Sequence, residues 1–250
     1  MKKMTLSVVL LLLVNTSIYA EEFAAVLKWS KRVELSTPVS GLVQKVFAVT
    51  GDVVAKGNVL VQLDPRSFKA NLKYTKARLK NTDEQTLEAK RELDRQLDMY
   101  DRSMLSDHDL QVSKNNFMSS RSGYLQAQAE LTKAKLDLEY SAIRAPFNAI
   151  IINSSAVKGQ VVASEIIPTV LVVVAEANRM LARFYASNSI VSELTLNQGV
   201  KVKISGESYQ GKVLKVALEL EPNQSGYAVD IIFDSKEKVL RAGQKVTIDL

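Results

Sequence analysis

Two long stretches with a seven-residue repeat constrain the fold of this chain more than any other feature. Across residues 68–100, and again across 110–138, the less polar side chains recur at alternating spacings of four and three. This spacing is typical of α-helices that pack along one side and supercoil left-handedly. Between the two stretches, Ser106 precedes Asp109 by three residues, which is a helix N-cap signal. We therefore expect an antiparallel α-helical coiled-coil hairpin over residues 65–140.

The segments on either side of the expected hairpin are related to each other. Gly41 and Gly51 are separated by the same interval as Ala149 and Gly159. Each of the later glycines is followed by a polar residue and then by Val-Val. Both segments contain the alternating or continuously apolar runs that strands of a small sheet sandwich require. We interpret this internal repeat as two β-rich halves of one domain, which the hairpin interrupts.

The first of these halves resembles part of a domain that carries a prosthetic group. The stretch TGDVVAKG, residues 50–57, is similar to the first half of a biotinyl or lipoyl domain. Such a domain carries its cofactor on one lysine, usually in an Asp-Lys or Met-Lys pair. The chain has no Asp-Lys pair, and its only Met-Lys pair is at Met1. Because the hairpin occupies the turn that would present this lysine, we expect a lipoyl-like β-sandwich of residues 35–64 plus 141–175 without a cofactor.

The last third of the chain is expected to form a small β-barrel, residues 176–250. Turn signals such as Asn197-Gln198-Gly199 separate its apolar runs, and residues 189–194 suit a short helix at one barrel end. The predicted strands are Met180–Ala186, Val200–Ile204, Gly211–Ala217, Tyr227–Phe233 and Lys245–Leu250. We assign residues 21–34 to a separate N-terminal strand segment.

The N-terminus has the features of an export signal. Lys2 and Lys3 precede a short apolar stretch, residues 6–14, and Ala20 is a suitable cleavage position. The apolar stretch is short for a bilayer span. We expect residues 1–20 to be a signal peptide and the mature chain to be exported and soluble; an uncleaved anchor is the alternative.

Composition argues against several classes of function. The net charge is +6, and without the first twenty residues 31 basic residues face 27 acidic ones, so no basic block indicates nucleic acid. The chain has no cysteine, and its only histidine, His108, lies between Asp107 and Asp109. Adjacent residues on a solvated turn do not form a buried catalytic triad, and one histidine does not supply a zinc site. We expect no enzyme activity, no metal and no cofactor.

These features together resemble the HlyD-type periplasmic adaptor, or membrane fusion protein, family, and most of all the adaptors of RND-type efflux pumps. The resemblance covers residues 33–250 and is carried by SGLVQKVFAVTGDVVAKGNVLVQLD, by YSAIRAPFNAII and by the hairpin between them. Asn148-Ala149 departs mildly from the family's usual Asp-Gly at this point. The resemblance implies an adaptor that links an inner-membrane transporter to a TolC-like outer-membrane channel, usually as a ring of six.

The resemblance also implies a docking signature at the end of the hairpin. Family members carry an arginine, three residues, a leucine, six residues and a serine. Arg95, Met99 and Ser106 match this spacing, with methionine in place of leucine. Arg95 would donate to channel carbonyls or carboxylates, and Met99 would fill an apolar groove. Ser106 would cap the second helix and form a hydrogen bond outward. The alternative is an ordinary surface arginine, a seam residue and a cap.

Other functions remain open from the sequence alone. The transporter partner would be of the RND type by resemblance, and an ABC-type exporter is the alternative. A prosthetic-group carrier is a further alternative, which the missing lysine context and the export signal disfavour. A membrane-proximal domain, which RND-pump adaptors usually have, is not evident, so the mode of contact with the pump is open.

Overall fold

The computed structural model describes residues 22–163, 169–222, 224–236 and 238–250. The chain divides into two compact units, one built from residues 22–30 and 178–250 and the other from residues 31–177. The expected signal peptide, residues 1–20, lies outside the described residues. None of the helices in the described ranges is long and apolar enough to cross a membrane.

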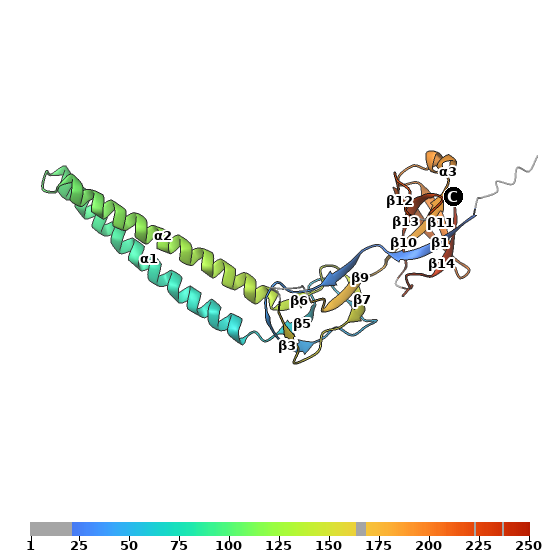
Figure 1. The fold of residues 1–250 in the computed structure, drawn as a ribbon, viewed down its shortest axis with the longest axis horizontal. Coiled ribbons are helices and arrows are strands. Elements are labelled where there is room, and N and C mark those ends of the chain that lie inside the picture. The colour runs from blue at the N-terminus through green and yellow to red at the C-terminus, as the bar shows by residue number, and fades with distance from the viewer. Residues whose placement is uncertain (1–21, 164–168, 223, 237) are drawn as a thin grey trace, which may run out of the picture. The chain divides into compact units, whose positions relative to one another are not determined.

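Six strands of the first unit close into a barrel (Figure 1). In barrel order they are β1 (Glu22–Trp29), β10 (Arg179–Ala186), β13 (Tyr227–Asp234), β12 (Glu207–Val216), β11 (Gly199–Ile204) and β14 (Lys245–Asp249). All neighbouring pairs are antiparallel. Closure leaves no strand edge exposed, which removes a template for pairing with other chains.

Five of the six barrel strands lie where the sequence predicts strands. The largest difference is at β12, which begins at Glu207 and so starts four residues before the predicted Gly211. The sixth strand, β1, comes from the N-terminal segment, residues 21–34. This segment divides, because β1 pairs with β10 and β14 whereas β2 (Arg32–Leu35) pairs with β9 (Val172–Glu176) of the other unit. The expected short helix is present as α3 (Asn188–Glu193).

Alternate side chains of the strands fill the barrel interior. Leu27, Phe184 and Ile248 are almost completely buried there. Gly211 lies where the packing is tightest, since a Cβ at this position would be 2.6 Å from a methyl carbon of Ile231. Trp29, the only tryptophan of the chain, packs against the same core. Its fluorescence therefore reports on this unit.

A cluster of charged side chains ties the barrel to the connection between β12 and β13. Arg183 donates to both carboxylate oxygens of Asp230, at 2.6 and 2.8 Å, and to Glu221 at 2.9 Å. Tyr185 donates its hydroxyl to the other oxygen of Glu221 at 2.7 Å. The hydrogen bonds to buried Asp230 raise the pKa of Arg183 above its ordinary value. The arginine thus stays ionised and holds two carboxylates.

The second unit contains two four-stranded sheets that enclose its apolar core. One sheet has the order β2-β9-β7-β4 and the other β6-β5-β3-β8. The strands not yet given are β3 (Gly41–Val46), β4 (Val53–Val54), β5 (Val59–Leu63), β6 (Ala142–Arg144), β7 (Ala149–Ser154) and β8 (Val161–Val162). Val43, Leu60 and Ile151 belong to the core that these sheets share.

The internal repeat appears in the sheets as an exchange of short strands. Strand β4 of the first half pairs with β7 of the second, and β8 of the second half pairs with β3 of the first. The N–H of Gly51 donates to the carbonyl of Ile151 at 2.8 Å, and that of Gly159 donates to the carbonyl of Val43 at 2.9 Å. Both glycines have positive φ, +96° and +89°, the left-handed region that glycine adopts without strain. Each half therefore completes the sheet of the other.

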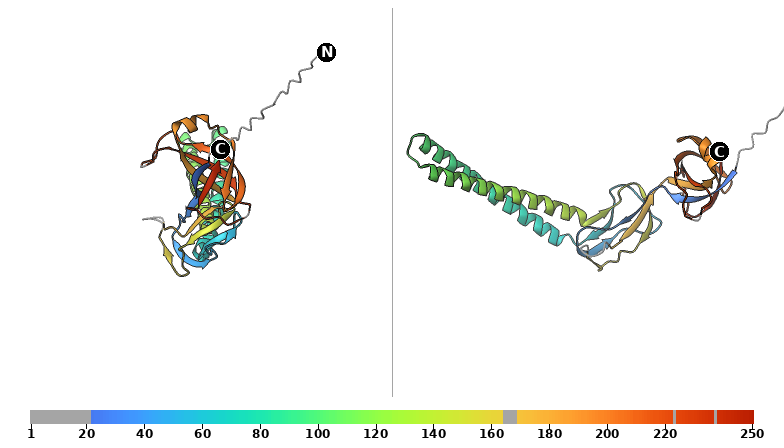
Figure 2. Two further views of the ribbon diagram at one scale, coloured as in Figure 1. Left: turned by 90° about the vertical axis from the view of Figure 1, so that its right-hand side faces the viewer. Right: turned by 45° about the horizontal axis from the view of Figure 1, so that its top comes forward.

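Two long helices lie between the halves in sequence and run side by side in opposite directions (Figures 1 and 2). Helix α1 is Arg66–Asp101 and helix α2 is Asp107–Tyr140. The less exposed residues of α1 follow the predicted spacing, and Thr75 is buried among them. The buried residues of α2 are Leu110, Ser113, Ala127 and Ala134, all on the predicted seam.

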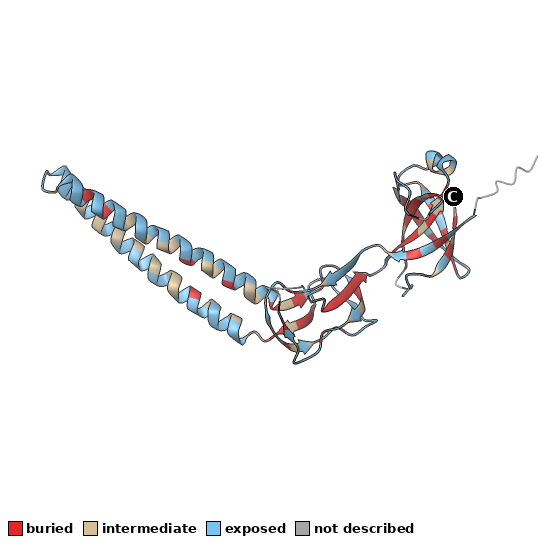
Figure 3. Ribbon diagram, in the orientation of Figure 1, coloured by how far each residue is buried: buried red, intermediate tan, exposed pale blue. Residues whose placement is uncertain are grey.

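Polar contacts and exposure distinguish the helix pair from the sheets. Arg78 donates to Glu130 at 2.6 Å, and the hydroxyl of Thr86 donates to the carbonyl of Ser120 at 3.0 Å, so both contacts join the helices. Figure 3 shows that buried residues concentrate in the sheets and the barrel, whereas the helices are mostly exposed. The predicted class, mixed β and α with a barrel and long helices, is confirmed.

Candidate docking site at the turn between the helices

We call the end of the helix pair, residues 91–113, the tip. Its turn is closed by short-range hydrogen bonds, from the N–H of Met104 to the carbonyl of Met99 at 2.9 Å and from Ser103 to Tyr100 at 2.8 Å. Ser103 has a φ of +57°, which the tight reversal requires. The hydroxyl of Tyr100 donates to Asp107 at 2.6 Å, which links the last turn of α1 to the first turn of α2. The tip is therefore an ordered turn.

Ser106 caps the second helix, as the sequence predicts. Its hydroxyl oxygen accepts from the N–H of Asp109 at 3.2 Å, and the hydroxyl donates to the carboxylate of Asp109 at 2.6 Å. The serine is exposed, so its hydroxyl oxygen retains capacity to accept from a partner. Its first effect is to fix the start of α2.

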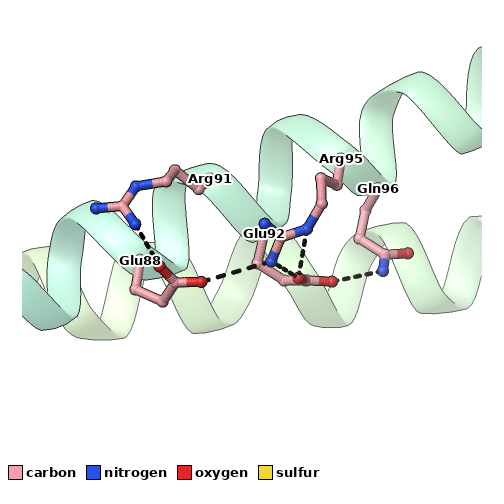
Figure 4. A network of polar contacts seen from close by, with 5 residues as sticks. All are labelled: Glu88, Arg91, Glu92, Arg95 and Gln96. Carbon is pink, nitrogen blue, oxygen red and sulfur yellow. Dashed lines mark hydrogen bonds and ion pairs between the residues drawn. The ribbon is translucent and has the colours of Figure 1, made fainter.

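Arg95 belongs to a ladder of charges on α1 (Figure 4). It donates through Nε to Glu92 at 3.1 Å, makes a second, shorter contact with the same carboxylate, and reaches Glu88 at 3.5 Å. The hydrogen bond to Glu92 raises the pKa of Arg95. Gln96 donates to the other oxygen of Glu92 at 2.7 Å, and the bonds from Gln96 and Arg95 lower the pKa of Glu92. The side chain of Arg95 is 58% exposed, so its carboxylate partners orient a guanidinium that solvent and partners can reach.

The structure places all three predicted docking residues at the same end of the helix pair. Arg95 and Met99 are one helical turn apart on α1, and Ser106 is the residue before α2. Met99 is 39% exposed although it begins the last turn of a packed helix. Met104, which lies outside the signature, is more exposed still, at 69%. Two thioether side chains thus flank the turn.

A groove within the tip was not predicted. It encloses about 350 Å³ and is lined by Glu92, Gln96, Leu105, Asp109, Val112, Ser113 and Asn116. Ser113 is 93% buried, given its 7% exposure, and its hydroxyl oxygen has no hydrogen-bond partner among the described residues. The sequence places Ser113 on the helix seam, but no local signal marks the groove, because it depends on how two helices meet.

The described residues offer little for chemistry at the tip. His108 is exposed in the first turn of α2, and the hydroxyl of Ser106 is bonded to Asp109. Across the described ranges, no three histidine, cysteine or acidic side chains are grouped so that they hold a metal ion. The arrangement is suited to contact with another molecule through an arginine, two methionines and a groove.

Comparison with known proteins gives a family match over the sheets and the helix pair. The family model described as CzcB-like, barrel-sandwich hybrid domain matches residues 31–175. The nodulation protein NolF of Rhizobium meliloti (strain 1021) is 25% identical over 223 residues, which cover 88% of this chain and 60% of NolF. The macrolide export protein MacA of Yersinia pestis is 27% identical over 197 residues, which cover 73% of this chain and 52% of MacA.

Solved structures share the fold. MacA from Actinobacillus actinomycetemcomitans has a TM-score of 0.69 at 22% identity, covering 92% of this chain and 77% of that one. At this identity the likeness concerns the fold alone. The chain spans between half and three fifths of the length of the two curated relatives above.

Proposed function

The chain belongs to the family of membrane fusion, or periplasmic adaptor, proteins with a CzcB-like barrel-sandwich hybrid domain, and we propose that it bridges an inner-membrane transporter and a TolC-like outer-membrane channel in an efflux system. The transporter is of the RND type in this proposal, with an ABC-type exporter as the alternative. The role is non-enzymatic, and the protein acts in the periplasm after removal of residues 1–20.

The pairing of strands in the two sheets supports our proposal of a lipoyl-like domain without a carrier function. In this proposal the exchanged strands β4 and β8 form the sandwich, and the helix pair occupies the turn where a carrier would present its lysine. Asp64 accepts from the N–H of Arg66 at 3.1 Å, and the next residues enter α1 directly. The chain at this point continues into 36 residues of helix and offers no lysine turn. In this proposal the domain contributes geometry and not group transfer.

The observation that carries the proposal is the composition of the tip. An α-helix rises about 1.5 Å per residue, so α1 is about 54 Å long and its end is remote from its start. At that end, Arg95 and Met99 are accessible, and the capped Ser106 fixes the direction of the returning helix. We assign Arg95 to charged hydrogen bonds with the channel, Met99 to an apolar contact, and Ser106 to the cap and a further hydrogen bond. A ring of such chains, six by family resemblance, would repeat each contact and raise its effect through effective concentration.

The test replaces Arg95 in one variant and the nearby Arg91 in a second variant, which serves as the control. Arg95→Gln removes the charge that the proposal assigns to the partner, and Arg91→Gln removes an equally exposed arginine that pairs with Glu88 at 2.7 Å. We expect Arg95→Gln to lose cross-linking to the outer-membrane channel and the efflux phenotype, whereas Arg91→Gln retains both. Helix content at 222 nm should match that of the unmodified chain in both variants, because exposed ion pairs add little stability. Full cross-linking and efflux by Arg95→Gln would show that the docking assignment is wrong.

A further inference from the structure

The groove within the tip has the properties of a binding site that the docking signature does not include. It is lined by residues of both helices and of the turn, and none of Arg95, Met99 and Ser106 is among them. Any partner that covers the tip would also meet this groove. Its side chains therefore indicate what a partner must present there.

The groove is rich in hydrogen-bond acceptors. Glu92 contributes a carboxylate whose pKa is lowered by its bonds from Gln96 and Arg95, so it is ionised at neutral pH. Gln96 uses its NH2 group on Glu92, which leaves its carbonyl oxygen as an acceptor. Asp109 contributes a second carboxylate, which accepts from the hydroxyl of Ser106 at 2.6 Å. None of the ion pairs within the described part of the chain includes it. Figure 4 shows Glu92 and Gln96 side by side on α1.

One lining side chain has an unsatisfied hydrogen-bonding group. Ser113 is 7% exposed, and its hydroxyl oxygen has no partner among the described residues. Buried polar groups in native proteins are nearly always hydrogen-bonded, and leaving one unsatisfied is destabilising. The oxygen itself is closed to solvent, so a ligand in the groove satisfies this hydroxyl only after a local side-chain rearrangement that exposes it.

The charge of the region selects the class of ligand. Residues 91–113 contain six carboxylates and three arginines, a net charge of −3, whereas the whole chain carries +6. The groove lining itself has two acidic side chains and no basic one. Glu92 is already paired with Arg95, so Asp109 is the carboxylate whose charge a ligand would meet first. Leu105 and Val112 add apolar walls, which suit the aliphatic stem of a long basic side chain while its charged end meets the carboxylates.

We propose that this groove receives an arginine or lysine side chain from the protein that docks on the tip. The assignment of that protein as the outer-membrane channel rests on the proposed function, whereas the acceptance of a basic side chain rests on the groove. Contact at the tip would then work in both directions: Arg95 donates to the partner, and the groove accepts from it. Such a reciprocal pair of charged contacts fixes the orientation of two docking surfaces more strictly than one contact does.

The groove can be tested without the partner. The full chain, labelled with 15N, is titrated with N-acetyl-arginine methylamide and, in parallel, with the neutral analogue N-acetyl-citrulline methylamide, while the side-chain amide signals of Gln96 and Asn116 are followed. We expect saturable shifts with the arginine probe and binding about tenfold weaker with the citrulline probe, since charged hydrogen bonds are the stronger ones. N-acetyl-lysine methylamide in a third titration decides between guanidinium and ammonium. Equal responses to the charged and neutral probes, or no response to either, would overturn the proposal.

Two variants connect the groove to docking. Val112→Lys places an ammonium on a wall of the groove at a position that is 44% exposed, and Gln111→Lys places the same charge on the exposed neighbouring residue, which does not line the groove. We expect Val112→Lys to lose both the arginine-probe response and cross-linking to the channel, with Gln111→Lys retaining both. Retained cross-linking in Val112→Lys after loss of the probe response would overturn the docking role. If the unmodified chain cross-links to no channel, the proposed function fails, and the probe titration still decides the groove.

Discussion

The charged cluster on the barrel allows one prediction about stability to be developed in detail. Arg183→Met removes the partner of Asp230, which is 5% exposed and accepts two hydrogen bonds from the arginine. Removing one member of a buried ion pair leaves an uncompensated charge and destabilises a protein by about 3–5 kcal/mol. The contact with Glu221 adds less, because that carboxylate is 41% exposed. We therefore expect the barrel to lose about 3 kcal/mol or more.

The double variant separates the lost charge partner from lost packing. In Arg183→Met/Asp230→Leu both charges are gone, and replacing a buried pair with apolar residues is often close to neutral. We expect this variant to recover most of the lost stability. Arg179→Met is the control, since Arg179 lies on the same strand but is exposed, and such a change is within about 0.5 kcal/mol.

The two units provide separate signals for the measurement. Urea unfolding followed by Trp29 fluorescence reports on the barrel, whereas circular dichroism at 222 nm reports mainly on α1 and α2 of the other unit. With a slope of about 1 kcal/mol/M for a unit of this size, the fluorescence midpoint of Arg183→Met should fall by about 3 M. The midpoint at 222 nm should not move. A fluorescence shift below about 1 M, or a double variant as unstable as the single one, would refute the reasoning.

Two further predictions follow from the backbone and from the tyrosines. Gly51→Ala and Gly159→Ala should each destabilise the sheet unit by about 1–2 kcal/mol, and by equal amounts, because both glycines have positive φ and neither added methyl meets an atom within 4 Å. Thermal unfolding of both variants checks this. A large difference between their midpoints would contradict the equivalence of the halves. Tyr100 and Tyr185, which donate to carboxylates, and Tyr209, which is buried, have raised pKa values. Their contribution to stability is therefore complete below the ordinary tyrosine pKa of about 10 and is lost as pH rises through the raised values. In an absorbance titration at 295 nm, tyrosine ionisation should occur at higher pH in the folded chain than in the chain unfolded by urea. Coincident titration curves would contradict this prediction.

Local patterns made much of the fold predictable. The helix seams were visible because their spacing depends on neighbours within one helix, and the cap at Ser106 is a contact over three residues. Five barrel strands were visible as apolar runs between turn residues. By contrast, strands β4 and β8 have two residues each, which is too short for a periodic signal. Their place in the sheets became clear only from their partners.

The remaining features depend on contacts that a linear pattern does not contain. The pattern of β1 suits a strand, but only its pairing with β10 and β14 assigns it to the barrel. At the tip, the spacing of three residues between Glu92 and Arg95 is a local signal for the ion pair that the structure shows. The groove at Ser113 requires side chains from two helices and the turn. The sequence pattern of one segment therefore cannot predict it.

The exchange of strands between the halves has a consequence for the order in which the chain folds. During synthesis the first half emerges with β3 and β4 lacking their partners β8 and β7, which follow only after the whole of both helices. The helices need mainly contacts within and between themselves, of the kind that form early. Once paired, they hold the two chain ends of the insertion together, and the N–H of Leu63 meets the carbonyl of Ser141 at 2.8 Å. Pairing of the helices therefore acts like a short loop between Leu63 and Ser141. Most of the entropy cost of bringing these two residues together arises before the sheets assemble. We therefore expect the helix pair to bring the two halves of the sheets together during folding. Adding seven residues to each helix would move the tip outward and leave the contact between Leu63 and Ser141 unchanged.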